Sequence, residues 1–224
     1  MLVIALVAPG AFGALAFSRA STFDARSIDV SGIEHLHRAE VLRAADISKE
    51  TNVLWLDEGG VEQRLESEPW IARAEVGVSF PLTIRIVVRE RTPVAVSDGT
   101  MGEALIAADG TSLGTGPRGA LPVIQLAAAG ATEGPRPNAV GAARAVAALT
   151  PPLQEDVKRV RVLLDGTLEM FLRQGPTIRF GTPDDAARKA RAIERILSWA
   201  AEQGTTIRTM SVVSPSAPAA RLVP

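Results

Sequence analysis

The sequence predicts an α+β protein with a membrane helix at its N-terminus and two folded units after it. Three observations support this prediction. Residues 1–17 are uncharged and mostly apolar. Residues 24–91 show the periodicities of strand, helix, helix, strand and strand in that order, and residues 92–213 show many short strands with helices among them. Since two helices can cover one face of a small sheet, the unit at 24–91 can bury a core of its own.

The composition limits the classes of function. Hydrophobic residues make up 46% of the 224 residues, which is typical of a globular protein. The 24 Lys and Arg nearly balance the 25 Asp and Glu, so no net basic field attracts nucleic-acid phosphates. There is no cysteine, which excludes disulfides, thiolate catalysis and Cys-ligated metals.

The N-terminal run is MLVIALVAPGAFGALAF, near the lower limit of length for crossing a hydrocarbon core of about 30 Å. We interpret residues 1–19 as a single-pass anchor in the cytoplasmic membrane. A cleaved signal peptide, with an A-x-A-like site at 14–16, and a buried core helix remain alternatives. Arg19 and Arg26 follow the run and no basic residue precedes it, so we expect a basic segment that belongs before Met1.

Residues 24–91 form the first expected unit. Ser27–Val30 alternates as a strand does, and helices are expected at 37–46 and after Asp57, which can cap the second one. Strands are expected at 72–80 and 82–91, joined by a tight hairpin. The apolar side chains of the first of these strands share one face, and they are Ala72, Ala74, Val76, Val78 and Phe80.

Residues 92–213 form the second expected unit. Helices are expected at 139–149 and 183–203, the latter with Thr182 as its N-cap and Pro183 in its first turn. Asp-Gly pairs at 109–110 and 165–166 predict tight turns. Strands are expected at 93–96, 104–108, 121–126, 158–164, 167–172, 177–180 and 206–213. Residues 127–138 read as a loop, and residues 214–224 as a flexible tail.

A catalytic constellation is hard to assemble from these residues. His35 and His37 form an H-x-H pair without a carboxylate cluster or cysteine nearby in the sequence, which favours an exposed turn over a metal site. The acidic pair 184–185 suits a helix N-terminus. The basic side chains Arg188, Lys189, Arg191 and Arg195 read as a solvated helix face, with a contact to protein or anionic lipid as the alternative. Packing is the first interpretation for Trp55, Trp70 and Trp199, and an interface role is the second. No cofactor, metal or small-molecule substrate is predicted.

Four strings occur in an order that resembles the POTRA domain of the FtsQ/DivIB family of bacterial cell-division proteins. They are IDVSGI at 28–33, NVLWLD at 52–57, EPWIARAEV at 68–76 and FPLTIRIVVRERTPVAV at 80–96. LIAADGTSLG at 105–114 and LPVI at 121–124 are similar to the β domain that follows it in the family. The resemblance covers nearly the whole chain, although residues 127–150 carry little of it, and His37 stands where the family often has Ser or Thr.

The resemblance implies a POTRA domain at 24–91, an FtsQ-type β domain at 92–213 and no enzymatic activity. It implies a scaffold outside the cytoplasmic membrane, enriched at the division septum, that helps to control septal peptidoglycan synthesis. The implied partners are divisome membrane proteins similar to FtsB (DivIC) and FtsL. Two other functions stay open. One is a POTRA-containing secretion or outer-membrane assembly factor, and the other is an exported cell-wall enzyme.

The last predicted strand is the candidate partner site. An edge strand has unpaired N–H and C=O groups to which a partner segment can add as a new strand. The candidate residues are Thr206, Ile207, Arg208, Thr209, Met210, Ser211, Val212 and Val213. The family's C-terminal region, which receives FtsB, is similar. A proline at Thr209 or Ser211 is expected to weaken partner binding, unless this strand lies in the middle of the sheet.

Overall fold

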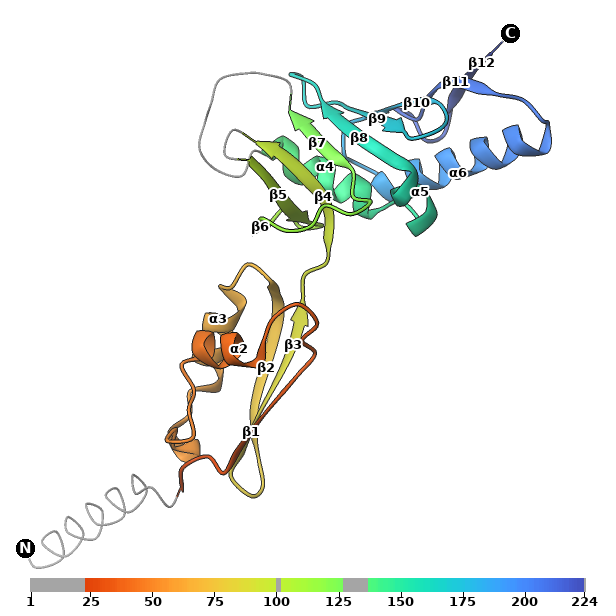
Figure 1. Cartoon of the computed structure of the whole chain (residues 1–224). Helices are drawn as coiled ribbons and strands as arrows, with labels where there is room; N and C mark the ends of the chain where they lie inside the picture. Colours follow the sequence, from red (N-terminus) through yellow and green to blue (C-terminus); the bar gives the residue numbers. More distant parts are fainter. Residues whose placement is uncertain (1–22, 100–101, 127–136, 224) are drawn as a thin grey trace, which may run out of the picture. The chain divides into compact units, whose positions relative to one another are not determined.

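The computed structural model describes residues 23–99, 102–126 and 137–223, and the chain divides into two compact units between Arg91 and Thr92 (Figure 1). The predicted α+β class is confirmed, because helices accompany a three-stranded sheet in the first unit and a nine-stranded sheet in the second. The membrane helix predicted at 1–19 lies outside the described residues. Within the described ranges, no helix is both long enough and apolar enough to cross a membrane.

The first unit has the predicted order of strand, two helices and two strands. Its elements are β1 (Ser27–Ser31), α2 (Arg38–Ala45), the 3-10 turn η2 (Val53–Trp55), α3 (Glu58–Glu66), β2 (Ile71–Ser79) and β3 (Thr83–Glu90). The sheet order is β1-β3-β2, with β1 parallel and β2 antiparallel to β3. Asp57 caps α3 as predicted, because its Oδ1 accepts a hydrogen bond of 3.0 Å from the Gly60 N–H.

The core of the first unit lies between the two helices and the sheet. Val41, Leu65, Ile71, Ile84 and Ile86 are each at most 1% exposed. The apolar face predicted for β2 extends beyond this core. Its middle residues are buried, whereas its last two members, Val78 and Phe80, are 42% and 98% exposed. The hairpin tip therefore projects past the region that the helices cover.

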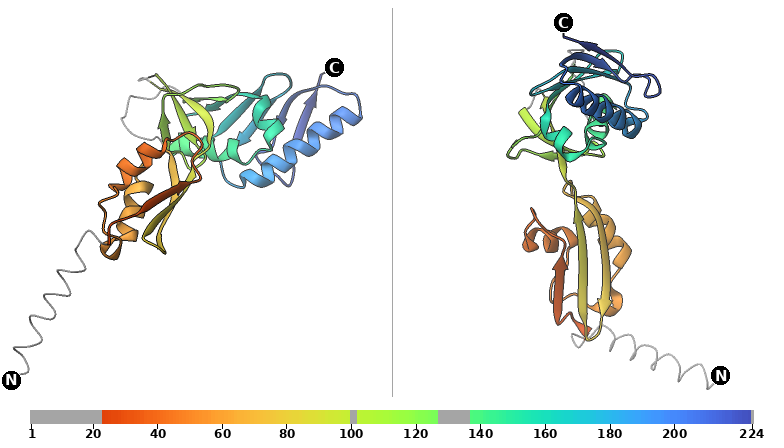
Figure 2. Two further views of the ribbon diagram at one scale, coloured as in Figure 1. Left: turned by 60° about the horizontal axis from the view of Figure 1, so that its bottom comes forward. Right: turned by 90° about the vertical axis from the view of Figure 1, so that its right-hand side faces the viewer.

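The second unit is built on a nine-stranded sheet of order β12-β11-β10-β9-β8-β7-β4-β5-β6. The strands are β4 (Pro93–Gly99), β5 (Gly102–Ala107), β6 (Ser112–Gly114), β7 (Val123–Leu126), β8 (Val157–Val162), β9 (Leu168–Leu172), β10 (Thr177–Gly181), β11 (Ile207–Ser211) and β12 (Ala219–Leu222). The helices are α4 (Pro137–Ala147), α5 (Pro151–Asp156) and α6 (Ala186–Glu202). Both α4 and α6 lie on one face of the sheet (Figures 1 and 2).

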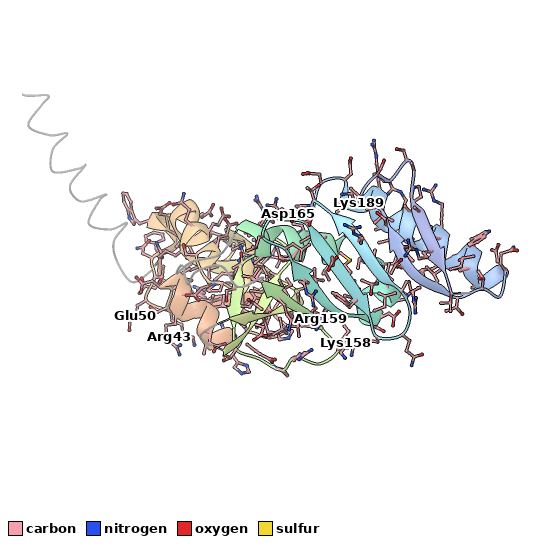
Figure 3. All side chains as sticks on the ribbon, turned by 90° about the horizontal axis from the view of Figure 1, so that it is seen from above. Arg43, Glu50, Lys158, Arg159, Asp165 and Lys189 are labelled. Atoms are coloured by element: carbon pink, nitrogen blue, oxygen red, sulfur yellow. The ribbon has the colours of Figure 1, made fainter. Side chains whose placement is uncertain are left out.

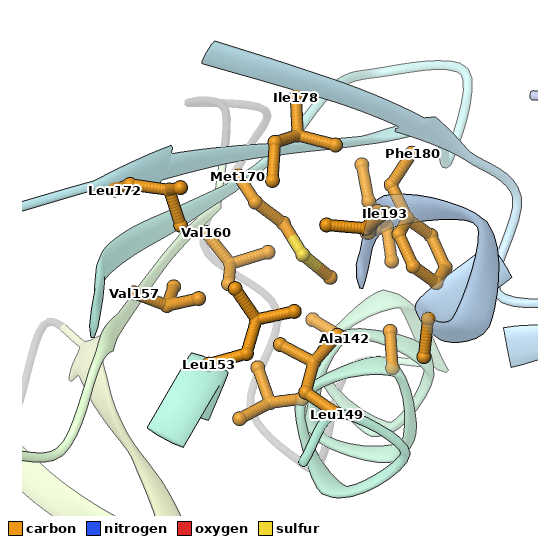
Figure 4. Close-up of a cluster of buried hydrophobic side chains, with 14 of the residues drawn as sticks. Ala142, Leu149, Leu153, Val157, Val160, Met170, Leu172, Ile178, Phe180 and Ile193 are labelled. Carbon is orange, nitrogen blue, oxygen red and sulfur yellow. The ribbon is translucent and has the colours of Figure 1, made fainter. Parts of the chain in front are cut away.

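The core of the second unit fills the space between these helices and that face. Inward side chains of neighbouring strands, among them Val160, Met170 and Ile178, meet Phe180 and Ile193 there (Figure 4). All five are fully buried. Because side chains alternate along a strand, the residues between them point to the opposite face of the sheet.

Both predicted Asp-Gly turns form, and both are closed in the same way. Asp109 and Asp165 each accept a hydrogen bond at Oδ1 from the backbone N–H two residues later, at 2.9 and 3.0 Å. The Thr167 hydroxyl adds a second bond of 2.7 Å to Asp165. The hydroxyl and the backbone N–H of Thr167 lower the pKa of Asp165, although burial raises it slightly.

Two predictions for the second unit were wrong, and one helix was missed. Helix α6 begins at Ala186, not Pro183, because its N-cap Asp185 has a left-handed backbone with φ of 54° that breaks the helix before it. The short helix α5, which begins at Pro151, was not predicted, although proline is tolerated in the first turn of a helix. The tail predicted to be flexible contains the strand β12 at Ala219–Leu222.

Candidate partner-binding edge

Strand β11, the core of the predicted partner site 206–213, is not an edge strand. It pairs in parallel with β10 on one side and antiparallel with β12 on the other. The Val212 N–H donates to the Arg179 carbonyl in β10, so by alternation the N–H groups of Thr209 and Ser211 face β12. A proline at either position would therefore disturb the pairing of β12 within this chain, which corrects the expected effect.

Strand β12, not β11, is the edge strand at this end of the sheet. All four of its residues are exposed, and in the described part of the chain it pairs with β11 alone. The Val223 N–H donates to the Thr206 carbonyl at 2.9 Å. Because donors alternate along a strand, the N–H groups of Ala220 and Leu222 then point away from the sheet. This is a short free edge that another chain can extend.

Two rows of side chains cross the sheet on the face away from the helices. One row aligns Arg159, Phe171, Thr177, Thr209 and Arg221 across strands β8 to β12. The next row aligns Arg161, Glu169, Arg179, Ser211 and Ala219. These two arginine rows hold four arginines and one glutamate, so this face is electropositive and attracts acidic groups.

Phe171 is held between two of these arginines. The guanidinium carbons of Arg159 and Arg161 lie 4.4 and 5.1 Å from its ring centroid, within the range of cation–π attraction. Arg161 also reaches Glu169 at 3.8 Å. The Nε of Arg159 is buried without a hydrogen-bond partner among the described residues (Arg159 is labelled in Figure 3). The rows are therefore partly ordered before any partner arrives.

On the helix side of β12 lies an apolar groove. Its lining comes from α6 and the C-terminal segment and consists of Ala192, Arg195, Ile196, Trp199, Pro218 and Ala220. The Trp199 side chain is 46% exposed. This groove, here named the α6 groove, can receive an apolar side chain beside the free edge.

Lys189 does not belong to the solvated basic face predicted for α6. It is 3% exposed, and its Nζ donates to the Thr182 carbonyl at 2.8 Å and lies 5.2 Å from the centre of the Phe180 ring (Figure 3). Burial lowers the pKa of Lys189, whereas the nearby carboxylates of Asp184 and Asp185 raise it by less. Lys189 therefore fastens the β10–α6 connection instead of facing a partner.

The histidine pair predicted in an exposed turn lies beside the end of β3. The His35 ring stacks on Trp70, with ring centroids 4.8 Å apart, and its Nδ1 lies 3.4 Å from Glu90. His37 is the N-cap of α2, and its N–H donates to Glu40 at 2.7 Å. In the part of the chain that the structure describes, no three His, Cys, Asp or Glu side chains gather as they would around a metal ion.

Comparisons with known proteins agree with this architecture. The family model described as "POTRA domain, FtsQ-type" matches residues 23–91. The "Cell division protein FtsQ" of Mycolicibacterium smegmatis is 32% identical over 87% of this chain and 56% of its own length. Proteins of the same name from Mycobacterium tuberculosis and Mycobacteroides abscessus are 31% and 28% identical over 97% of this chain.

These relatives are longer than this chain, which spans between 56% and 67% of their lengths. The resemblance nevertheless runs through both compact units, because the matches to the mycobacterial proteins cover 86% or more of the chain. Residues 23–91 are a POTRA domain of the FtsQ type, and the chain belongs to the FtsQ family of cell-division proteins.

Proposed function

We propose that this chain is a non-catalytic scaffold of the division septum, anchored in the cytoplasmic membrane by residues 1–19 with its folded units on the extracytoplasmic side. The family membership supports a role in division. In this role the protein binds other divisome membrane proteins, similar to FtsB or DivIC and to FtsL, and thereby helps to control septal peptidoglycan synthesis. The POTRA unit corresponds to 24–91 and the β domain to 92–213.

The observation on which the binding role rests is the free edge of β12. A partner segment that adds to β12 gains backbone hydrogen bonds from Ala220 and Leu222, and it displaces no helix or strand that the structure describes. The two faces flanking that edge differ in chemistry. The α6 groove lies on one face and the arginine rows lie on the other.

This difference specifies the partner segment. Side chains of an added strand alternate between the two faces of the sheet. One set therefore meets the apolar α6 groove, and the other set meets the arginine rows. We expect an extended partner segment in which apolar residues alternate with acidic ones, and its charge is expected to speed association at low salt.

The test uses prolines in β12. Ala220→Pro removes an outward N–H and leaves the bonds between β12 and β11 in place, because proline is tolerated where the N–H of an edge strand faces solvent. Each lost hydrogen bond contributes about 0.5–1.5 kcal/mol, so the dissociation constant for an FtsB-like partner is expected to rise by a factor of about 2 to 12. The measurement is isothermal titration with the full chain in detergent.

Ala220→Ser is the matched control, since it changes the same side chain in the α6 groove but keeps the N–H, and it is expected to weaken binding less than Ala220→Pro does. Arg179→Glu and Arg221→Glu test the arginine rows, and they are expected to weaken binding most at low salt. Unchanged affinity in Ala220→Pro and Leu222→Pro, with an intact fold by circular dichroism, would move the partner site away from β12.

A further inference from the structure

The first unit leaves its most exposed large apolar side chains at one end. Phe80, in the connection between β2 and β3, is 98% exposed, and Leu54 and Trp55 in η2 are each 55% exposed. Water-exposed aromatic and apolar side chains gathered in one place mark an interaction surface. We name Leu54, Trp55 and Phe80 the apolar tip.

Backbone contacts place these three residues at the same end. The Arg26 N–H donates to the Leu82 carbonyl at 2.9 Å, beside Phe80. The Ala25 N–H donates to the Thr51 carbonyl at 3.0 Å, and η2 begins two residues after Thr51. Figures 1 and 2 show the β2–β3 connection and the segment around η2 together at the end where β1 starts.

The apolar tip is also where the described chain begins. The uncharged run of 1–17 ends six residues before Phe23, the first described residue. Six residues span at most about 20 Å when fully extended. If that run is held in a bilayer, the apolar tip cannot lie far from the membrane surface.

We propose that the apolar tip inserts into the membrane interface, so that the first unit rests on the bilayer beside its own anchor. This inference depends on the anchor proposed above. Tryptophan favours the headgroup level because its ring is amphipathic, and leucine and phenylalanine gain by leaving water for the boundary of the acyl chains. With both the anchor and the tip engaged, the first unit has a fixed tilt on the membrane.

The charges around the apolar tip favour an apolar contact over an electrostatic one. Arg26 and Lys49 are accompanied by Asp24, Glu50 and Asp57 in the same segments of sequence. Because the two signs are mixed, anionic lipid gives little additional attraction. We therefore expect insertion into neutral phosphatidylcholine, with little change when anionic phosphatidylglycerol is added.

The absence of cysteine makes the test direct, since one introduced cysteine carries one nitroxide label. The full chain is reconstituted in phosphatidylcholine vesicles with the label at Phe80→Cys, at Glu68→Cys or at Ala8→Cys. Glu68 is exposed and precedes β2 at the opposite end of the unit, so it is the matched control. Ala8 lies within the apolar run and reports on the anchor. Collision with oxygen, which enters lipid, is compared with collision with a water-soluble nickel chelate.

The inference predicts that labels 8 and 80 collide mainly with oxygen and that label 68 collides mainly with nickel. If label 8 is in lipid while label 80 behaves like label 68, the apolar tip is in water, and the inference fails although the anchor stands. If label 80 is shielded from both reagents, protein covers the tip, for example a second copy, and the inference also fails. If label 8 is in water, the anchor fails and the inference fails with it.

Tryptophan fluorescence gives an independent measurement. In a chain carrying Trp70→Phe and Trp199→Phe, Trp55 is the remaining tryptophan. Its emission is expected to shift to shorter wavelength on reconstitution and to be quenched by brominated lipid. Phe80→Ser is expected to lose most of that quenching, whereas Glu68→Ser keeps it. Equal quenching in the Phe80→Ser and unchanged chains would mean that Phe80 does not help to hold the tip in lipid.

Discussion

Glu90 holds the segment between β1 and α2 with a single carboxylate. Its Oε1 accepts from the N–H groups of Glu34 and Leu36, at 3.0 and 2.9 Å, and its Oε2 accepts from the N–H of His35 at 2.8 Å. The Glu90 side chain is 7% exposed. Burial raises the pKa of Glu90, but these three donors and the charge of His35 lower it by more, so that it falls below its ordinary value of 4.5.

We predict that Glu90→Gln destabilises the first unit. The amide keeps one acceptor oxygen, but its NH₂ group then faces a backbone N–H, so at least one charge-assisted bond worth about 1.5–3 kcal/mol is lost at neutral pH. Urea unfolding of the full chain in detergent measures the loss in free energy of unfolding. Hydrogen exchange in peptides that cover residues 34–36 shows whether the loss is at this segment. Glu50→Gln is the control, because that side chain is exposed (Figure 3), and it is expected to leave stability unchanged.

The pH dependence follows from the lowered pKa of Glu90. A carboxyl with a lower pKa in the folded state adds stability that is fully present above its unfolded pKa and disappears as pH falls through the folded pKa. The stability difference between the unchanged protein and Glu90→Gln is therefore expected to shrink as pH is lowered below 4.5. A difference that stays constant down to pH 2 would assign the effect to packing instead of charge.

Helix α3 closes one edge of the three-stranded sheet. Glu58, Glu62 and Glu66 are spaced four residues apart and therefore share one face of α3. Each accepts at Oε1 from a backbone N–H of β2, those of Val78, Val76 and Ala74, at 3.2, 2.9 and 3.2 Å. The outward donors of β2 are thus occupied by this chain. An extended partner segment cannot pair with β2 unless these carboxylates first leave its N–H groups. Strand β2 is therefore a poor binding site for a partner strand.

We predict that replacing all three glutamates with alanine opens the β2 edge. Exposed strand edges pair with other chains, so the variant is expected to self-associate at concentrations where the unchanged protein is monomeric. Sedimentation velocity in detergent measures this. The variant with three glutamines is the control, because the amide oxygen can still accept the N–H bonds, and it is expected to remain monomeric. Association of the glutamine variant as well would mean that negative charge, not hydrogen bonding, protects the edge.

The sequence predicts an element well where its buried and exposed side chains alternate in a regular pattern. It predicts an element poorly where only backbone hydrogen bonds define the element. In the first unit the alternation of residues 82–91 predicted β3 within one residue at both ends, and the Asp57 cap predicted where α3 begins. Strand β12 was missed because all its side chains are exposed, so the sequence AARL lacks the alternation of a half-buried strand. The partner site was consequently placed one strand away from the edge.

The arginine rows were missed for a related reason. Arg159, Arg161 and Arg179 each occupy an outward position that the alternation of its strand already indicates. Their alignment, however, depends on the pairing of β8, β9 and β10, and no pattern within one strand fixes its neighbours or its register. The exposure of Phe80 was missed for the same kind of reason. Alternation along β2 placed Phe80 on the apolar face of the strand, but the sequence of one strand does not say how far the helices cover that face.

On the scale of the whole molecule, the described residues form two separate cores, one within residues 25–88 and one within residues 95–212. Leu65 is fully buried in the first core, and Ile193 is fully buried in the second. Replacing a buried leucine or isoleucine with alanine costs about 2–5 kcal/mol, from lost burial and from the cavity that remains. Since neither residue belongs to the other core, we expect the destabilisation to stay within one unit.

We predict that Leu65→Ala lowers amide protection throughout residues 24–91 and leaves the strands of 92–213 protected. The matched variant Ile193→Ala is expected to show the reverse pattern. Hydrogen exchange with mass spectrometry on the full chain distinguishes the two, because its peptides report on each unit separately. Equal loss of protection in both units from either variant would show that they unfold as one cooperative body. Two independent transitions would instead allow the POTRA unit to open while the β12 edge stays intact, so that binding at β12 would survive damage to the POTRA unit.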